Sequence, residues 1–196
     1  MATVHDIAAA VLERQGRTTT MKLEKLVYYC QGWHLARHGA SLFAEPIEAW
    51  REGPVAPDLF KHHRQQREVA AWRRGSSGEL TPAESSTVAW VVSEYGGFTA
   101  GELSEMTHHE LPWKAARAGL PDSEPSDAKI STEIMRMYYS RQIAEAETAV
   151  SLATANAALE GVEFDEEWQD RLRDVATGKV TPDDLVAEVI GRIPRG

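Results

Sequence analysis

Helix start and stop signals punctuate most of this chain, and they constrain its fold more than any other feature. Residues 81–84, Thr-Pro-Ala-Glu, combine a capping threonine, a proline for the first turn and a glutamate that can bond back to the cap. Residues 99–102 repeat the capping pattern, and the glycines at 16, 39 and 96 follow segments with apolar residues at helical spacing. We therefore predict helices that begin or end at these positions, and a mainly α fold.

Residues 42–78 mostly lack the helical spacing of apolar residues and show strand and turn patterns instead. Residues 47–51 alternate apolar and polar side chains, as a short strand does, and Gly53-Pro54 is expected to end that strand. Pro57 suits the first turn of a short helix that runs to about Arg64. Residues 68–72 read as a second short strand. We expect one small β ribbon here and no large sheet.

The last third of the chain reads as helical. Asp127 is expected to cap a helix that continues as an alanine-rich helix over residues 143–160, until Gly161 ends it. An amphipathic helix is expected after Asp165, ending at Gly178, and a last helix from Thr181 to about residue 193. The sequence thus predicts a compact domain over residues 1–142 and a separable helical tail over residues 143–196.

Charge is distributed unevenly along the chain. The net charge is −9, and residues from 144 onward carry 12 acidic and 5 basic side chains. An acidic tail suits a basic protein partner, whereas the net charge argues against a general nucleic-acid binder. There is no apolar run of membrane-spanning length and no secretory signal pattern, and the single cysteine agrees with a reducing compartment. We expect a cytoplasmic protein without a membrane partner.

The sequence offers no catalytic constellation. His34 and His38 have the spacing of a shared metal site, but Leu35 stands where the zinc-protease pattern needs a glutamate. Cys30 lies within an apolar stripe, where a thiol is inert. Lys22 and Lys25 form either a basic spot or an ordinary solvated face. We expect no enzyme activity, no cofactor and no metal.

Three separated segments carry a first resemblance. They are the run MKLEKLVYYCQGWH at residues 21–34, Gly-Pro-Val at 53–55 and THHELPW at 107–113. Together they resemble the Panacea domain of SocA-like antitoxins and phage-associated proteins, over about residues 3–140. The resemblance implies neutralisation of a toxin by direct binding, without catalysis. Its candidate partner-binding or structural residues are Lys22, Lys25, Tyr29, Trp33, Gly53, Pro54, Val55, His108, Pro112 and Trp113.

Residues 156–161, NAALEG, carry a second resemblance. They are similar to the inhibitory motif of VbhA-type antitoxins, in which a serine or threonine is followed, four residues later, by Glu-Gly or Glu-Asn. The matching positions are Asn156, Glu160 and Gly161, with Asn156 as a departure. VbhA-type proteins silence Fic-family toxins, in which an arginine holds the terminal phosphate of ATP. The resemblance implies that Glu160 competes for this arginine and blocks AMP transfer; a solvated glutamate before a glycine stop is the alternative.

These resemblances predict an antitoxin of a type II toxin–antitoxin pair whose partner is a Fic-type toxin. Two other functions stay open. One SocA-like relative is an adaptor that delivers its toxin to a protease, so a protease is an alternative partner. A phage-encoded module that binds a host protein is the third reading.

Overall fold

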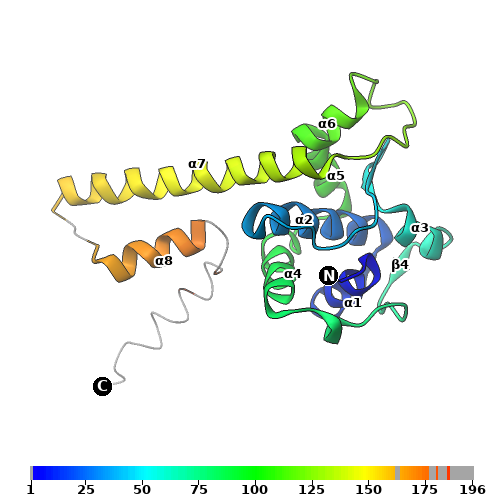
Figure 1. The fold of residues 1–196 in the computed structure, drawn as a ribbon, viewed down its shortest axis with the longest axis horizontal. Helices are drawn as coiled ribbons and strands as arrows, with labels where there is room; N and C mark the ends of the chain where they lie inside the picture. Colours follow the sequence, from blue (N-terminus) through cyan, green and yellow to red (C-terminus); the bar gives the residue numbers. More distant parts are fainter. Residues whose placement is uncertain (1, 162–163, 177–179, 181–184, 186–196) are drawn as a thin grey trace. The chain divides into compact units, whose positions relative to one another are not determined.

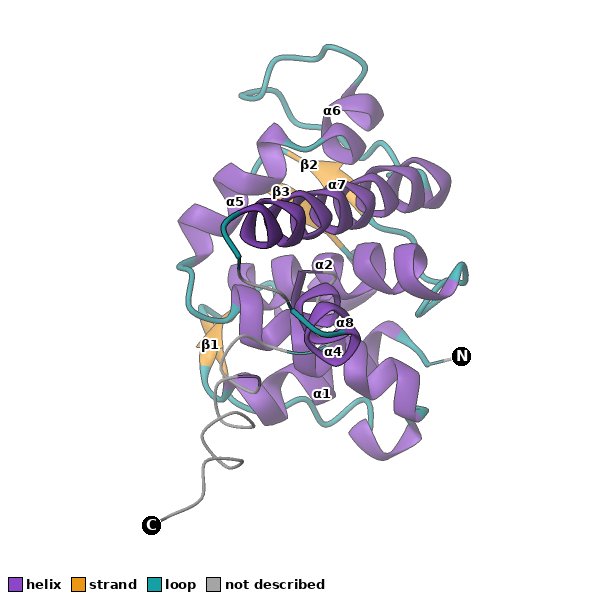
Figure 2. Ribbon diagram, turned by 90° about the vertical axis from the view of Figure 1, so that its left-hand side faces the viewer, coloured by secondary structure: helices purple, strands orange, loops and turns teal. Residues whose placement is uncertain are grey.

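The structure, a computed structural model, describes residues 2–161, 164–176, 180 and 185, and it is mainly α, as predicted (Figures 1 and 2). The chain divides into two compact units, Met1–Ser140 and Arg141–Gly196. The described elements, in order, are α1 (Val4–Gln15), β1 (Thr18–Thr19), α2 (Thr20–His38), β2 (Glu48–Trp50), β3 (Gly53–Val55), α3 (Pro57–His63), β4 (Glu68–Val69), the 3-10 turn η1 (Ser77–Glu79), α4 (Pro82–Tyr95), α5 (Ala100–His109), α6 (Leu111–Arg117), α7 (Thr132–Leu159) and α8 (Glu166–Ala176).

Helix α2 is the centre of the first unit. It packs against α1 and α4 on one side and against α5 and β3 on the other (Figure 1). Residues 23–32 are all buried, whatever side of the helix they occupy. A helix that is surrounded in this way buries its charged residues together with its apolar ones.

The capping signals predicted from sequence are present. Thr81 and Glu84 form a reciprocal capping box at the start of α4, and Thr99 and Glu102 form one at the start of α5. Gly39 ends α2 in the left-handed conformation, which glycine adopts at the lowest steric cost. These helix ends are set by side chains within four residues of each other, which explains why the sequence predicts them.

The strands differ from the prediction, because they form two ribbons (Figure 2). The first strand ends before Gly53-Pro54, as expected, but these two residues then begin a second strand, so that Ala49 faces Pro54 across a β2–β3 hairpin. Gly53 has a φ of +98°, and this conformation allows the tight turn. The second ribbon pairs Thr18 in β1 with Val69 in β4. Strand β1 has only two residues, and so it carries no alternating pattern that the sequence could reveal.

Asp127 does not cap the following helix, contrary to the prediction. Residues 128–130 instead run extended beside β2, where Ala49 donates to the Ala128 carbonyl at 2.8 Å and Ile130 donates to the Ile47 carbonyl at 2.8 Å. Helix α7 starts at Thr132, and the Ser131 hydroxyl accepts the amide N–H of Ile134. The helix then runs without interruption to Leu159, as expected. Gly178 and the last predicted helix, from Thr181, lie outside the described residues.

Candidate partner-binding site

The predicted inhibitory motif lies at the end of α7. Asn156 is exposed one turn before Glu160, whose amide N–H donates to the Asn156 carbonyl at 3.2 Å. Gly161 follows in the left-handed conformation, with a φ of +82°, and its amide N–H donates to the Ala158 carbonyl at 3.1 Å. The three residues are therefore adjacent, with the Asn156 and Glu160 side chains both open to solvent.

Large apolar side chains accompany this motif. Leu159 is 87% exposed and Leu152 is 62% exposed, the two highest values among the large apolar residues described. Positions 152, 156, 159 and 160 fall within about 100° around the helix axis, because an α-helix turns once per 3.6 residues. The end of α7 thus presents one solvent-facing stripe, the α7 face, in which two leucines flank an amide and a carboxylate.

Lys25 is not part of a basic spot, because it is 1% exposed. Its ammonium donates to the Pro54 carbonyl at 3.1 Å, and burial lowers the pKa of Lys25 to about 8. A Cβ on Gly53 would lie 2.7 Å from the Lys25 side chain and 2.8 Å from the Thr107 hydroxyl, and the φ of +98° at this position further favours glycine. Lys22 is half-buried, and its ammonium donates to the Gly96 carbonyl. Both lysines therefore tie α2 to other elements.

Glu24, which the sequence reading did not select, forms a buried pair with His63. Its Oε1 lies 2.7 Å from His63 Nε2, while its Oε2 accepts the Ala56 amide N–H at 2.8 Å. Both side chains are 3% exposed. The pair fixes α3 and the end of β3 to α2. The sequence did contain a signal for Glu24, because this residue stands in a helix with apolar residues on every side. A charged group that is buried in such a helix must be paired.

Glu110 is the second buried carboxylate. Its Oε2 accepts hydrogen bonds from the hydroxyls of Tyr28 and Tyr139, each at 2.8 Å. Burial raises the pKa of Glu110, and the hydrogen bonds from the tyrosines oppose that shift. Tyr139 lies directly over Gly32, where a Cβ would approach its ring to 2.2 Å. This cluster joins the first turns of α7 to α2 within the first unit.

Aromatic residues of the Panacea-like motif complete the framework. Tyr29 is buried and stacks on Tyr95 with ring centroids 4.0 Å apart, and Tyr95 also accepts the Trp33 indole N–H at 3.0 Å. Trp33 itself is half-buried. These contacts hold α2 against α4.

The THHELPW segment packs around Trp113. His108 stacks on this ring with centroids 4.1 Å apart, and the Trp113 indole N–H donates to the Trp50 carbonyl at 3.0 Å. The Arg117 guanidinium lies over the Trp113 ring, 4.6 Å from its centroid, and donates to the Ala49 carbonyl at 3.0 Å. Pro112 and Val55 are buried in the same region. Most of the motif residues are thus inside the fold, where they set its architecture.

His34 and Cys30 are both buried in the first unit. His34 Nδ1 lies 2.9 Å from the Thr87 hydroxyl, and burial followed by the charge of His38 lowers the pKa of His34 to about 4. Cys30 is fully buried, which raises the pKa of its thiol. Among the described residues, no group of three or more His, Cys, Asp or Glu side chains is arranged to hold a metal ion. No helix in the described part of the chain is long and apolar enough to span a membrane.

Comparison with known families agrees with both resemblances. The family model described as Antitoxin SocA-like, Panacea domain, matches residues 23–114. The model described as Antitoxin VbhA matches residues 147–192. No curated protein and no solved structure matches the chain. Residues 23–114 are therefore similar to SocA-like Panacea antitoxins and residues 147–192 to the antitoxin VbhA, in the order predicted from the motifs.

Proposed function

We propose that this chain is an antitoxin that holds a Fic-type, AMP-transferring toxin inactive by presenting Glu160 to the toxin's ATP site. Both matched families are antitoxins, which supports a role in a toxin–antitoxin pair. The resemblance of residues 156–161 to VbhA-type antitoxins suggests the Fic-type partner. The observation that carries binding through this segment is the α7 face, where the leucines and the motif residues are exposed together.

The physical chemistry of the α7 face suits a groove on another protein. Burying each of Leu152 and Leu159 on a partner contributes roughly 1.5–3 kcal/mol. An amphipathic helix that lies in an apolar groove is a common mode of protein recognition. The leucines supply affinity in this arrangement, and the polar residues beside them supply specificity.

The position of Glu160 favours a cationic partner. A carboxylate at a helix C-terminus is disfavoured by the helix dipole, typically by about 0.3–1 kcal/mol. No ion pair within the described part of the chain compensates Glu160. An arginine of a toxin would pair with it through two parallel hydrogen bonds and would then be withdrawn from the phosphates of ATP.

The test uses the purified complex of the full chain with its toxin. Glu160→Gln keeps the shape and removes the charge, so the variant complex should transfer AMP from ATP while the wild-type complex stays silent. The matched control is Glu147→Gln, an exposed carboxylate on another side of α7, and it should stay silent. All three complexes should still form, because Leu152 and Leu159 are retained.

Two results would redirect the assignment. A Glu160→Gln complex as silent as the wild type would remove the role of this carboxylate and favour steric masking of the toxin. A wild-type complex with full toxin activity would favour the protease-adaptor function, in which the cellular half-life of the toxin depends on this chain.

A further inference from the structure

Residues 61–74 have a charge opposite to that of the chain as a whole. This segment holds five Lys or Arg side chains and one acidic side chain, whereas the net charge of the chain is −9. All five cations are exposed: Lys61, Arg64, Arg67, Arg73 and Arg74. The first unit therefore carries a cationic patch that the overall charge conceals.

No arginine of this patch forms an ion pair with another described residue. Glu68, the single acidic residue of the segment, lies 3.5 Å from Arg17, and Lys61 pairs with Asp58. Within the described part of the chain, Arg64, Arg67, Arg73 and Arg74 make no ion pair. Four guanidinium groups thus remain available to an anion from outside.

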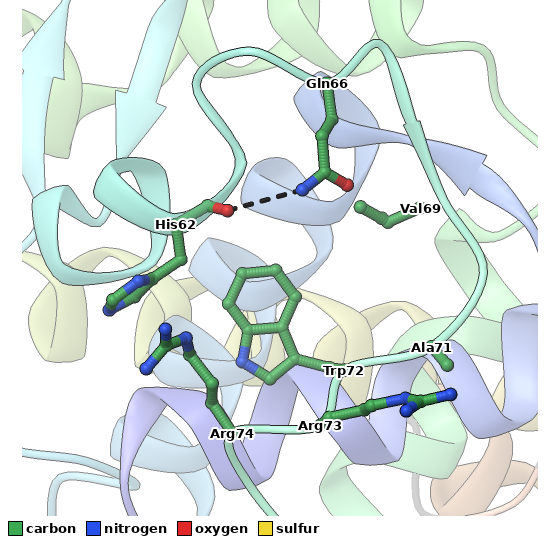
Figure 3. Close-up of a pocket in the computed structure, with 7 residues that line it drawn as sticks. All are labelled: His62, Gln66, Val69, Ala71, Trp72, Arg73 and Arg74. Carbon is green, nitrogen blue, oxygen red and sulfur yellow. Dashed lines mark hydrogen bonds between the residues drawn. The ribbon is translucent and has the colours of Figure 1, made fainter.

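Two arginines of the patch, Arg73 and Arg74, line a hollow of about 220 Å³. Its polar lining comes from His62, Gln66, Arg73 and Arg74, the Trp72 indole forms part of the wall, and no lining residue has a carboxylate (Figure 3). In Figure 3 the Arg74 guanidinium lies close to the His62 imidazole. Partial burial lowers the pKa of His62, and the positive charge of Arg74 lowers it further. We refer to this site as the arginine hollow.

The walls of the hollow are held by contacts with α1. The Trp72 indole N–H donates to His5 Nδ1 at 3.1 Å, and the two rings stack with centroids 5.9 Å apart. The Ser76 amide N–H donates to the Asp6 carboxylate at 2.8 Å. A Cβ on Gly75 would lie 2.2 Å from the His5 backbone, so the chain passes against α1 at this point. The arginines consequently project from a fixed frame, which reduces the entropy lost on binding.

We propose that the arginine hollow binds phosphate groups of a nucleic-acid backbone. Arginine suits phosphate because its planar guanidinium donates two parallel hydrogen bonds to the oxygens. The Arg73 and Arg74 side chains line the hollow, and Arg64 and Arg67 belong to the same cationic segment. Cations spread in this way match a ligand that carries anions at regular intervals and no cations. The surface of an acidic protein, in contrast, carries both negative and positive charges. The toxin partner proposed above suits the acidic tail, so a patch of opposite sign calls for a different ligand.

The experiment measures binding of the full chain to a fluorescein-labelled 20-base-pair duplex by anisotropy, over a series of salt concentrations. Arg73→Ala/Arg74→Ala should weaken binding and should lower the slope of log K against log salt by about 2, since each phosphate contact contributes about 0.9. The matched control is Lys114→Ala/Arg136→Ala, which removes two exposed cations elsewhere and should leave the slope unchanged. Thermal unfolding of both double variants verifies that each is folded.

Competitors identify the ligand. Unlabelled duplex should displace the probe, whereas inorganic phosphate, ATP and poly-glutamate at matched charge should displace it far less, because none of them spans several arginines with phosphates. No binding at about 50 mM salt would overturn the proposal, as would equal salt slopes for the two double variants. Displacement by ATP or inorganic phosphate at equal charge would assign the hollow to a free phosphate ligand instead. Equal displacement by poly-glutamate would assign it to an acidic protein.

Discussion

Gly32 is a position at which one added methyl group should destabilise the first unit. A Cβ there would lie 2.2, 2.5 and 2.9 Å from three atoms of the Tyr139 ring. The ring cannot move aside at low cost, because Tyr139 is 1% exposed and its hydroxyl donates to Glu110. Gly32→Ala must therefore displace Tyr139 or separate α2 from the first turns of α7.

The size of the loss follows from three contributions. Overpacking a closed core costs about 1–3 kcal/mol, and the displaced Tyr139 hydroxyl forfeits about 1 kcal/mol of hydrogen bonding. Alanine in place of glycine inside a helix returns about 0.8–1 kcal/mol. We expect a net loss of about 2 kcal/mol in the free energy of unfolding.

Urea unfolding followed by tryptophan fluorescence measures this loss, because five of the six tryptophans precede residue 140. The matched control is Gly101→Ala in α5, where the nearest atom to an added Cβ is Thr99 Oγ1 at 4.0 Å, and no loss is expected. The decisive comparison repeats Gly32→Ala in a Tyr139→Ala background, where the ring is absent and the substitution should cost nothing. An equal loss in both backgrounds would refute the clash.

Two further predictions concern buried titratable groups. Burial raises the pKa of Glu110 above its ordinary 4.5, so the stability that its protonation provides is present below that value and is lost as the pH rises through the folded-state pKa. Glu110→Gln keeps an acceptor for Tyr28 and Tyr139 and abolishes the titration, so the unfolding free energy of the variant minus that of the wild type should rise between about pH 4.5 and 7. A flat difference in chemical denaturation over that range would contradict this. Cys30 is buried with a raised thiol pKa, so an aromatic disulfide reagent should label it orders of magnitude more slowly in the native protein than in urea. Equal labelling rates by absorbance would show that the thiol is accessible.

The sequence by itself determined most helix boundaries. A cap such as Thr81 with Glu84, or a stop such as Gly39, depends on groups within one turn of the chain, so the residues are sufficient evidence. The continuous helix up to the NAALEG motif was predictable for the same reason, since no helix breaker stands between residues 132 and 159. The two antitoxin resemblances were equally available, because each segment that carries them is a short run of characteristic residues.

Only the tertiary structure decided which charged residues are buried and what they bind. Lys25, Glu24 and Glu110 find their partners 29, 39 and 82 residues away, respectively, and no local pattern encodes those pairings. The β1–β4 ribbon and the extended segment 128–130 were not predicted, because both depend on backbone hydrogen bonds to residues far away in the sequence. The strands involved are also too short to show an alternating apolar and polar pattern. The arginine hollow likewise needs α1 to hold Trp72 in place. Long-range packing, and not residue type, determines whether a lysine is a surface charge or a core anchor.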